Sequence, residues 1–345
     1  MESIDIVGIG NALVDQEFEV TDDFLRQHQI EKGMMTLIED AEQEKLIAEL
    51  SRRGELKKQS GGGSAANSLV GFSQFGGNAF YCCKVADDEA GAFYCKDLER
   101  VGITTNTGSC KHEGKTGRCL VMVTPDAERT MRTYLGITAD LSTDELDEDA
   151  IARAEYLYIE GYLVTSPIAL QAIARAKEVA RANGTKIAMT CSDPAMVKYF
   201  RDGIEAILDG GVDVMFCNQE EARILTGTDD VQEALQQLQQ RAGLVAITLG
   251  KDGALLGDGT RQVAVPGIKV QAVDTNGAGD MFAGAMMFGL TRNYPLAACG
   301  LLASHAAAQI VTEFGPRLSA DQQQQLLIRL QHEPEFNFKN DKRGV

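Results

Sequence analysis

The sequence lacks tryptophan, and aromatic residues make up only 6% of its 345 positions. A platform of aromatic rings on which single-stranded nucleic acid could stack is therefore not indicated. Positive charge is also scarce, because 33 Lys and Arg stand against 50 Asp and Glu and the formal net charge is −17. Such a chain repels phosphate backbones and anionic lipid surfaces, so neither nucleic acid nor a membrane is an expected partner.

Other missing patterns narrow the class of protein. The sequence has no apolar run of membrane-spanning length and no signal-peptide pattern at its N-terminus. The eight cysteines form no CxxC pair, which is typical of scattered thiols in a reducing cytoplasm. A GxxxxGK[ST] phosphate loop is absent, and Leu13 stands where a dinucleotide fingerprint beginning at Gly8 needs its third glycine. We therefore expect a cytoplasmic protein that is neither a P-loop enzyme nor a dinucleotide-dependent oxidoreductase.

Apolar segments of strand length alternate with segments of helical spacing along most of the chain. Buried strands are predicted at residues 3–10, 77–85, 156–160, 186–191, 212–217 and 244–249. This alternation predicts a mostly parallel sheet with helices on both faces. Shorter strands near the N-terminal third predict a small separate sheet, at residues 16–20, 34–38, 117–124 and 129–135.

The most informative segment is DTNGAGD at residues 274–280, followed by an apolar helix pattern. A loop of small residues opening into a helix leaves backbone N–H groups free and lets a ligand approach closely. With the helix dipole, these groups favour spread negative charge such as that of a phosphoryl group in transfer. The carboxylate of Asp280 can accept a proton from a hydroxyl group held there. An aspartate at a helix start is, alternatively, an ordinary N-cap.

Three further segments combine glycines or amides with the end of a strand or helix. Asn67 follows three glycines at residues 61–63 and offers both a donor and an acceptor to adjacent hydroxyls, unless the glycines only form a turn. Asn218 and Glu221 follow a predicted strand, where they either hold a hydrated Mg²⁺ near phosphates or mark an exposed helix start. The strand that ends at Thr248 leads into glycines that suit either a nucleotide site or a hairpin turn.

In this order and spacing, the segments resemble the signatures of the ribokinase-like (PfkB) family of carbohydrate and nucleoside kinases. GGGSAAN at residues 61–67 is similar to the first signature, DTNGAGD to the second, and NQEE at residues 218–221 to the magnesium motif. The resemblance covers nearly the whole chain. It implies a ribokinase-like, Rossmann-type three-layer α/β/α domain at residues 1–11, 41–108 and 137–345. A small β-sheet lid would be formed by insertions at residues 12–40 and 109–136.

The resemblance also implies roles for individual residues. Asp280 would be the catalytic base, Arg129 would clamp a phosphate, and the backbone N–H groups of Gly277, Ala278 and Gly279 would stabilise the phosphoryl charge. The acceptor would be held by Asn11, Asp15, Gly62, Gly63, Asn67 and Glu160. ATP, the co-substrate, would contact Asn218, Thr248, Gly250, Gly253, Asn276 and His305. Glu221 would act on Mg²⁺ through water, and Asp274 is a candidate to hold a monovalent cation such as K⁺.

Within the family, the GNxxxD spacing of Asn11 and Asp15 is similar to the adenosine kinase branch. This favours an adenosine-like ribonucleoside, phosphorylated at its 5′-hydroxyl, as the acceptor. A free sugar such as ribose or fructose is the alternative, and a non-catalytic sugar or nucleotide sensor on the same fold is a third. A nucleoside base needs an apolar wall, and the candidates, which could equally form the lid's own core, are Met34, Met35, Leu37, Leu120, Met122 and Tyr134.

Two expectations concern the lid as a whole. We expect it to close over the acceptor and bring Asp15 and Arg129 towards the loop of Asp280, because ATP would otherwise be hydrolysed by water. The exposed edges of a small sheet often pair with a second copy, which predicts a lid-mediated homodimer.

Overall fold

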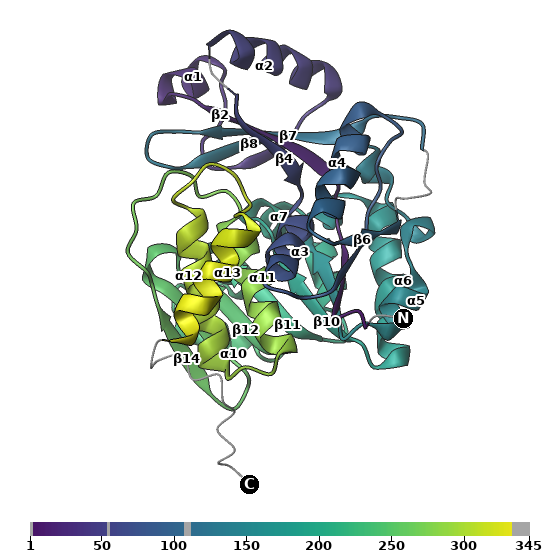
Figure 1. Ribbon diagram of the computed structural model, residues 1–345, viewed down its shortest axis with the longest axis vertical. Coiled ribbons are helices and arrows are strands. Elements are labelled where there is room, and N and C mark those ends of the chain that lie inside the picture. The colour runs from purple at the N-terminus through teal and green to yellow at the C-terminus, as the bar shows by residue number, and fades with distance from the viewer. Residues whose placement is uncertain (1–2, 54–55, 107–111, 333–345) are drawn as a thin grey trace.

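Two β-sheets of unequal size organise the molecule (Figure 1). The computed structural model describes residues 3–53, 56–106 and 112–332, so the expected domain limits at residues 1, 109 and 345 lie outside the described part. Within it, the larger sheet has the strand order β14-β13-β12-β11-β10-β9-β1-β5-β6, and the smaller has the order β3-β8-β7-β2-β4. None of the helices in these three segments is long and apolar enough to span a bilayer.

The larger sheet is parallel from β12 to β6, and only β13 runs in the opposite direction, antiparallel to both β12 and β14. Burial on both faces explains the continuous apolar runs in β1 (Ile6–Ile9) and β9 (Tyr156–Glu160). The prediction of an α/β fold with a mostly parallel sheet is confirmed. The other strands are β5 (Ala79–Cys82), β6 (Thr104–Thr105), β10 (Lys186–Thr190), β11 (Val212–Asn218), β12 (Ala242–Thr248), β13 (Gly253–Gly257) and β14 (Gln262–Pro266).

Helices cover both faces of this sheet over two separate apolar cores. One layer holds α5 (Glu148–Arg153), α6 (Pro167–Asn183), α7 (Pro194–Tyr199), α8 (Arg201–Leu208), α9 (Gln219–Thr226) and α10 (Val231–Leu238). The other holds α3 (Ser64–Gln74), α4 (Glu89–Arg100), α11 (Ala278–Thr291), α12 (Leu296–Ile310) and α13 (Ala320–Gln331). In that layer α11 packs against both α3 and α12, which explains why it is apolar on nearly all sides.

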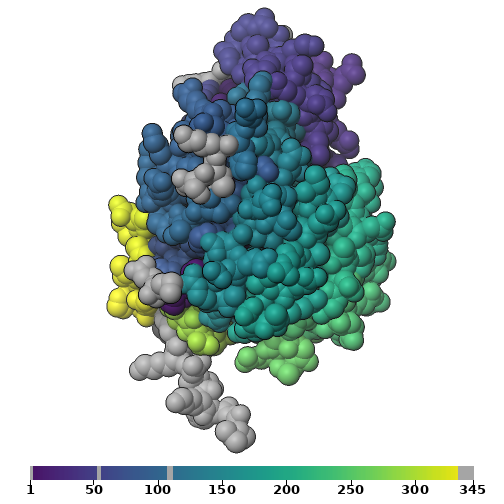
Figure 2. Space-filling view, turned by 90° about the vertical axis from the view of Figure 1, so that its right-hand side faces the viewer, coloured from purple at the N-terminus to yellow at the C-terminus, as the bar shows by residue number. Residues whose placement is uncertain are grey.

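The smaller sheet forms a lid over one edge of the larger one (Figure 1). Its outer face is covered by α1 (Asp22–Gln27) and α2 (Asp40–Arg53), which form a cap at one end of the molecule (Figure 2). Leu120 and Met122 pack beneath these helices with Phe24 and Leu50. The lid strands are β2 (Leu13–Glu19), β3 (Met35–Leu37), β4 (Leu56–Gly62), β7 (Thr116–Val123) and β8 (Arg129–Gly136).

The lid takes in more of the chain than the two predicted insertions. Helix α2 and strand β4 lie within residues 41–108, which the sequence analysis assigned to the large domain, yet β4 pairs with β2 in the lid sheet. The sequence of β4, LKKQSGG, has weak strand propensity. It ends in glycines of the first signature, GGGSAAN, which are typical of a turn.

The two edges of the lid sheet differ in how they are covered. Strand β4 is tied to the large domain by Lys58, whose Nζ donates to the carbonyl oxygens of Phe314 (3.0 Å) and Arg317 (3.2 Å). Strand β3 at the opposite edge is three residues long. A homodimer formed through a lid edge would therefore have to use the short strand β3.

Candidate active site

A cavity of about 290 Å³ lies between the carboxyl ends of the large sheet and the inner face of the lid. Strand β9 ends at Glu160, β11 at Asn218 and β12 at Thr248, and all three residues line this cavity. Open α/β sheets bind ligands at this edge, because the loops that leave parallel strands converge there. The lid contributes Asp15, Met35 and other inner-face residues from the opposite side.

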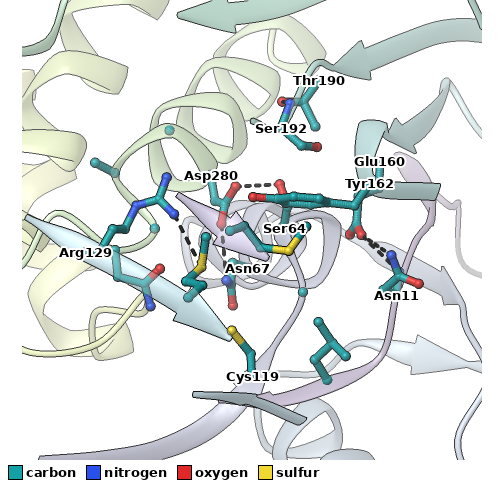
Figure 3. Close-up of a pocket in the computed structure, with 18 of the residues that line it drawn as sticks. Asn11, Ser64, Asn67, Cys119, Arg129, Glu160, Tyr162, Thr190, Ser192 and Asp280 are labelled. Atoms are coloured by element: carbon teal, nitrogen blue, oxygen red, sulfur yellow. Dashed lines mark hydrogen bonds between the residues drawn. The ribbon is translucent and has the colours of Figure 1, made fainter. Parts of the chain in front are cut away.

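Asp280 lies in the first turn of α11 and faces this cavity (Figure 3). The N-cap of the helix is Gly277, with φ of 73°, and a Cβ atom there would lie 2.6 Å from Pro316. The carboxylate of Asp280 accepts hydrogen bonds from Ser64 Oγ (2.6 Å) and Asn67 Nδ2 (3.2 Å), both on α3. Asp280 is therefore not the cap of its own helix, and burial raises its pKa while these two bonds oppose that shift.

Arg317 supports this arrangement from a loop that no sequence motif singled out. Its Nε donates to Asn67 Oδ1 (2.9 Å), so the amide nitrogen of Asn67 is turned towards Asp280. The guanidinium of Arg317 also pairs with Asp97, whose carboxylate accepts the backbone N–H of Gly61 (3.0 Å). Arg317 is separated from Asn67 by 250 residues, so only the fold brings it to the site.

Glu160 ties together two of the segments predicted to hold the acceptor. Its Oε1 accepts from Asn11 N (3.2 Å) and Asn11 Nδ2 (2.9 Å), and its Oε2 accepts from Ala65 N (2.8 Å) at the start of α3. Burial raises the pKa of Glu160 to about 7, against the effect of these bonds. Gly63, with φ of 93°, lies so close to the carbonyl oxygen of Asn11 that a side chain would collide with it. These contacts fix the position of Asn11 just after the carboxyl end of β1.

Asp15 and Arg129 reach the cavity from the lid. Burial raises the pKa of Asp15 to about 7, although the charge of Arg317 acts in the opposite direction. Burial disfavours the charged form of Arg129, but its neighbours Tyr162, Asp193 and Asp280 outweigh this and raise its pKa. Gly62 does not line the cavity; it lies against the carboxylate of Asp15 and leaves no room for a side chain.

Asn218 and Glu221 form a reciprocal pair at the start of α9. Asn218 Oδ1 accepts from Glu221 N (2.8 Å), while the two carboxylate oxygens accept from Asn218 N (2.8 Å) and Nδ2 (2.9 Å). The carboxyl group lines the cavity, and burial raises its pKa to about 8. A carboxyl group in the wall of the cavity is of the type that holds Mg²⁺ through the waters that this ion keeps.

The structure brings some predicted nucleotide and cation residues to the cavity and places others outside its lining. Asn276 and Thr248 line it together with Asn218. The carboxylate of Asp274 is fully buried beneath the loop, where it accepts from Asn276 N (2.8 Å) and Gly315 N (3.0 Å). Gly250, Gly253 and His305 also lie outside the lining; they belong to the turn Gly250–Asp252, to β13 and to α12.

The prediction of an apolar wall for a nucleoside base is correct for some of the six residues and wrong for the others. Met35 and Leu37 line the cavity, and Met34 packs beside them against the core of the large domain. Leu120 and Met122 lie on the other face of the lid sheet under α1 and α2, and Tyr134 lines a separate cleft on the outside. Successive side chains of a strand point to opposite faces of the sheet. The inner face of the lid therefore carries other apolar residues, which the sequence analysis did not select: Leu13, Cys119, Met131 and Leu135.

A carboxylate at a glycine-rich helix start, with polar groups suited to hydroxyls and a lid above them, is an arrangement that suits the transfer of a phosphoryl group to a small molecule. The sequence matches the family described as pfkB family carbohydrate kinase over residues 32–323. The chain therefore belongs to the PfkB family, as its signatures indicated, and is a phosphotransferase with an alcohol group as acceptor.

Solved structures and a curated relative agree with this fold. The adenosine kinase from Sinorhizobium meliloti is 36% identical, with a TM-score of 0.88 over 94% of this chain and 99% of that one. A probable sugar kinase from Rhizobium etli CFN 42 is 34% identical, with a TM-score of 0.88 over 94% and 100% of the two chains. Adenosine kinase 2 of Arabidopsis thaliana is 27% identical over 332 residues, which cover 90% of this chain and 94% of that protein.

Proposed function

We propose that the protein transfers the γ-phosphoryl group of Mg-ATP to the hydroxymethyl group of an adenosine-like ribonucleoside. The observation that carries the proposal is the placement of the Asp280 carboxylate. It is held by Ser64 and Asn67 at the N-terminus of α11 and faces a cavity whose lining combines amide, hydroxyl and carboxyl groups with apolar side chains of the lid.

The chemical step follows from this placement. Asp280 accepts the proton of the acceptor hydroxyl as that oxygen attacks the γ-phosphorus atom in line with the leaving group. The backbone N–H groups of residues 277–279 and the guanidinium of Arg129 stabilise the charge on the transferred group. Asp280 has to be ionised for this role, and its raised pKa predicts that activity is lost on the acidic side as the carboxylate takes up a proton.

The remaining ligands occupy the other half of the site. Glu221 would hold Mg²⁺ through water, and the metal would neutralise charge on the phosphates. Thr248, Asn218 and Asn276 face the triphosphate, whereas Gly250, Gly253 and His305 contact the nucleotide beyond the cavity. Asp274 orients the loop and is the candidate for a monovalent cation such as K⁺. We further propose that the enzyme acts in the cytoplasm, where ATP and free nucleosides are present, and that any homodimer forms through the lid.

The choice of a nucleoside rests on the apolar inner face of the lid. Asn11, Asp15 and Asn67 suit hydroxyls of either a ribose or a free sugar, so they do not discriminate. Leu37, Met131 and other apolar lid side chains line the same cavity and offer a wall that a free sugar would leave uncovered. The likeness to the adenosine kinase of S. meliloti supports this reading, and the likeness to a probable sugar kinase keeps ribose or fructose as the second candidate.

One experiment separates the candidates. Purified protein is incubated with Mg-ATP and a panel of nucleosides and free sugars, and both ATP consumption and product mass are measured. We expect adenosine to give a product heavier by one phosphate. A strongly active ketose or pentose with inactive adenosine would replace the nucleoside by a sugar, and no product from any acceptor while ATP still binds would favour the non-catalytic sensor.

A further inference from the structure

One buried contact between the lid and the catalytic loop has no part in the chemistry described above. Asn276 Nδ2 donates to Glu17 Oε1 at 2.9 Å, across 259 residues of sequence. Glu17 is on β2 of the lid and is 1% exposed, while Asn276 directly precedes Gly277 and is 6% exposed. The lid is therefore joined to the residue that leads into the N-terminus of α11.

The surroundings of Glu17 are unfavourable for a carboxyl group. Its Oε2 is buried and has no hydrogen-bond partner among the described residues. Asp274 and Asp15 are its acidic neighbours, and the nearby cation, Lys58, donates to the carbonyls of Phe314 and Arg317. Burying a carboxyl group among like charges costs stability, and one hydrogen bond to an amide offsets only part of that cost.

A second contact holds the same stretch of loop. Thr275 Oγ donates to the carbonyl oxygen of Ala127 (3.0 Å), at the tip of the hairpin that joins β7 to β8. On the other side, Asp274 accepts the backbone N–H of Asn276 within the loop and the backbone N–H of Gly315 (3.0 Å) in the large domain. The loop is therefore clamped between the large domain and two separate points of the lid, and the contact from Glu17 is the one next to the anion-binding N–H groups.

We propose that Glu17 is a positioning residue of the lid, which fixes the side chain of Asn276 and so makes the geometry of the anion hole depend on the docked lid. The inference rests on the proposed function, since it assigns that hole to phosphoryl transfer. Donors aimed at a developing charge lose their effect when they are displaced by about 1 Å, so a loop held by the lid is in order only when the acceptor is covered. This arrangement disfavours ATP hydrolysis in the open state.

The test compares two variants of Glu17 with nearly the same volume. Glu17→Gln keeps an oxygen that accepts from Asn276, whereas Glu17→Leu removes it. We expect the leucine variant to lower kcat by about 10–100-fold while the KM for ATP changes by less than about threefold, as for a lost interaction specific to the transition state. The glutamine variant should retain kcat within about threefold of the wild type.

A double-mutant cycle and a melting curve separate positioning from a structural role. Glu17→Leu combined with Asn276→Ala should be no slower than the slower single variant, because both remove the same contact. The melting temperature of Glu17→Leu should stay within about 3 °C of the wild type, since the change also removes an unpaired buried oxygen. Multiplicative losses in the cycle, or a leucine variant with wild-type kcat, would overturn the proposal.

Hydrogen exchange of the free protein provides a readout that needs no acceptor. Amides of residues 274–280 should exchange about tenfold faster in Glu17→Leu than in the wild type, with Glu17→Gln unchanged and peptides of α6 unaffected. Equal exchange in the loop would refute the contact's role whatever the enzyme phosphorylates. Faster exchange without turnover of any acceptor would instead leave the positioning role standing and count against the proposed kinase reaction.

Discussion

The two sheets face the cavity with different chemistry. The large domain lines the cavity with the charged and amide groups to which the proposed mechanism gives roles in phosphoryl transfer, among them Asp280, Glu221 and Asn218. These groups come from strand ends and helix starts packed on the two apolar cores. The lid supplies three charged groups, Asp15, Glu128 and Arg129, beside apolar side chains such as Leu37 and Met131. This division predicts that changes in the large domain alter turnover, whereas changes of the apolar side chains on the inner face of the lid alter the choice of acceptor.

The largest effect is expected from Asp280 in the large domain. Asp280→Asn keeps the hydrogen-bonding shape but removes the base, so kcat should fall by about 10²–10⁴-fold or more. ATP affinity, measured by calorimetry, should stay within about threefold, because the backbone N–H groups of the loop are unchanged. The matched control is Asp149→Asn, at an exposed position of α5. Turnover of the Asp280 variant near that of the control would remove the base from the mechanism.

A lid variant tests the other half of the comparison. Leu37 lines the cavity and is 38% exposed, whereas Leu56, 43% exposed on β4, does not line it. Leu37→Ala should raise the KM for a nucleoside about 5–10-fold, through loss of apolar contact with the base, and leave kcat nearly unchanged.

Leu56→Ala should leave both constants at wild-type values, since it removes a similar exposed side chain from the same sheet. The KM for a free sugar, if one is accepted, should be insensitive to both changes. Equal KM values for the nucleoside in the two variants would mean that the apolar face of the lid does not contact the base.

Sequence patterns predicted the strands of the large domain, and the residues with which it lines the cavity, better than they predicted the lid. The loop at residues 274–280 could be predicted from the sequence, because its glycines and Asp280 are close together in the chain and meet requirements of local backbone geometry. Contacts such as Arg317 with Asn67 or Glu17 with Asn276 join residues 250 or more apart and leave no local pattern. On the lid, a shift of one residue exchanges the two faces of a strand. Met122 was therefore selected although it lies on the outer face, whereas Cys119, on the inner face of the same strand, was not.

Glu221 provides a smaller test within the large domain. Glu221→Gln removes the carboxyl group that would ionise as the hydrated metal binds, so the Mg²⁺ concentration for half-maximal activity should rise about 5–10-fold. Glu220→Gln, next to it but exposed and paired with Arg223, is the matched control. Superimposable magnesium titrations of the two variants would assign Glu221 to capping α9 alone, through the hydrogen bonds that it exchanges with Asn218.

The smallest effect concerns the pH dependence of stability, where the lid again contributes through Asp15. Burial raises the pKa of Asp15 to about 7, from an ordinary value near 4, so between these pH values the folded protein holds a proton that the unfolded chain has lost. Stability from this group is full below about pH 4 and is lost as the pH rises through about 7. From pH 5.5 to 8.5 the loss is about 2 kcal/mol, or about 3 °C in melting temperature. The ligand-free wild type should therefore melt lower at pH 8.5 than at 5.5, and Asp15→Asn should show a fall smaller by about that amount. Calorimetric melting curves of both proteins across this range decide the matter, and parallel curves would mean that Asp15 is ionised in the folded protein throughout.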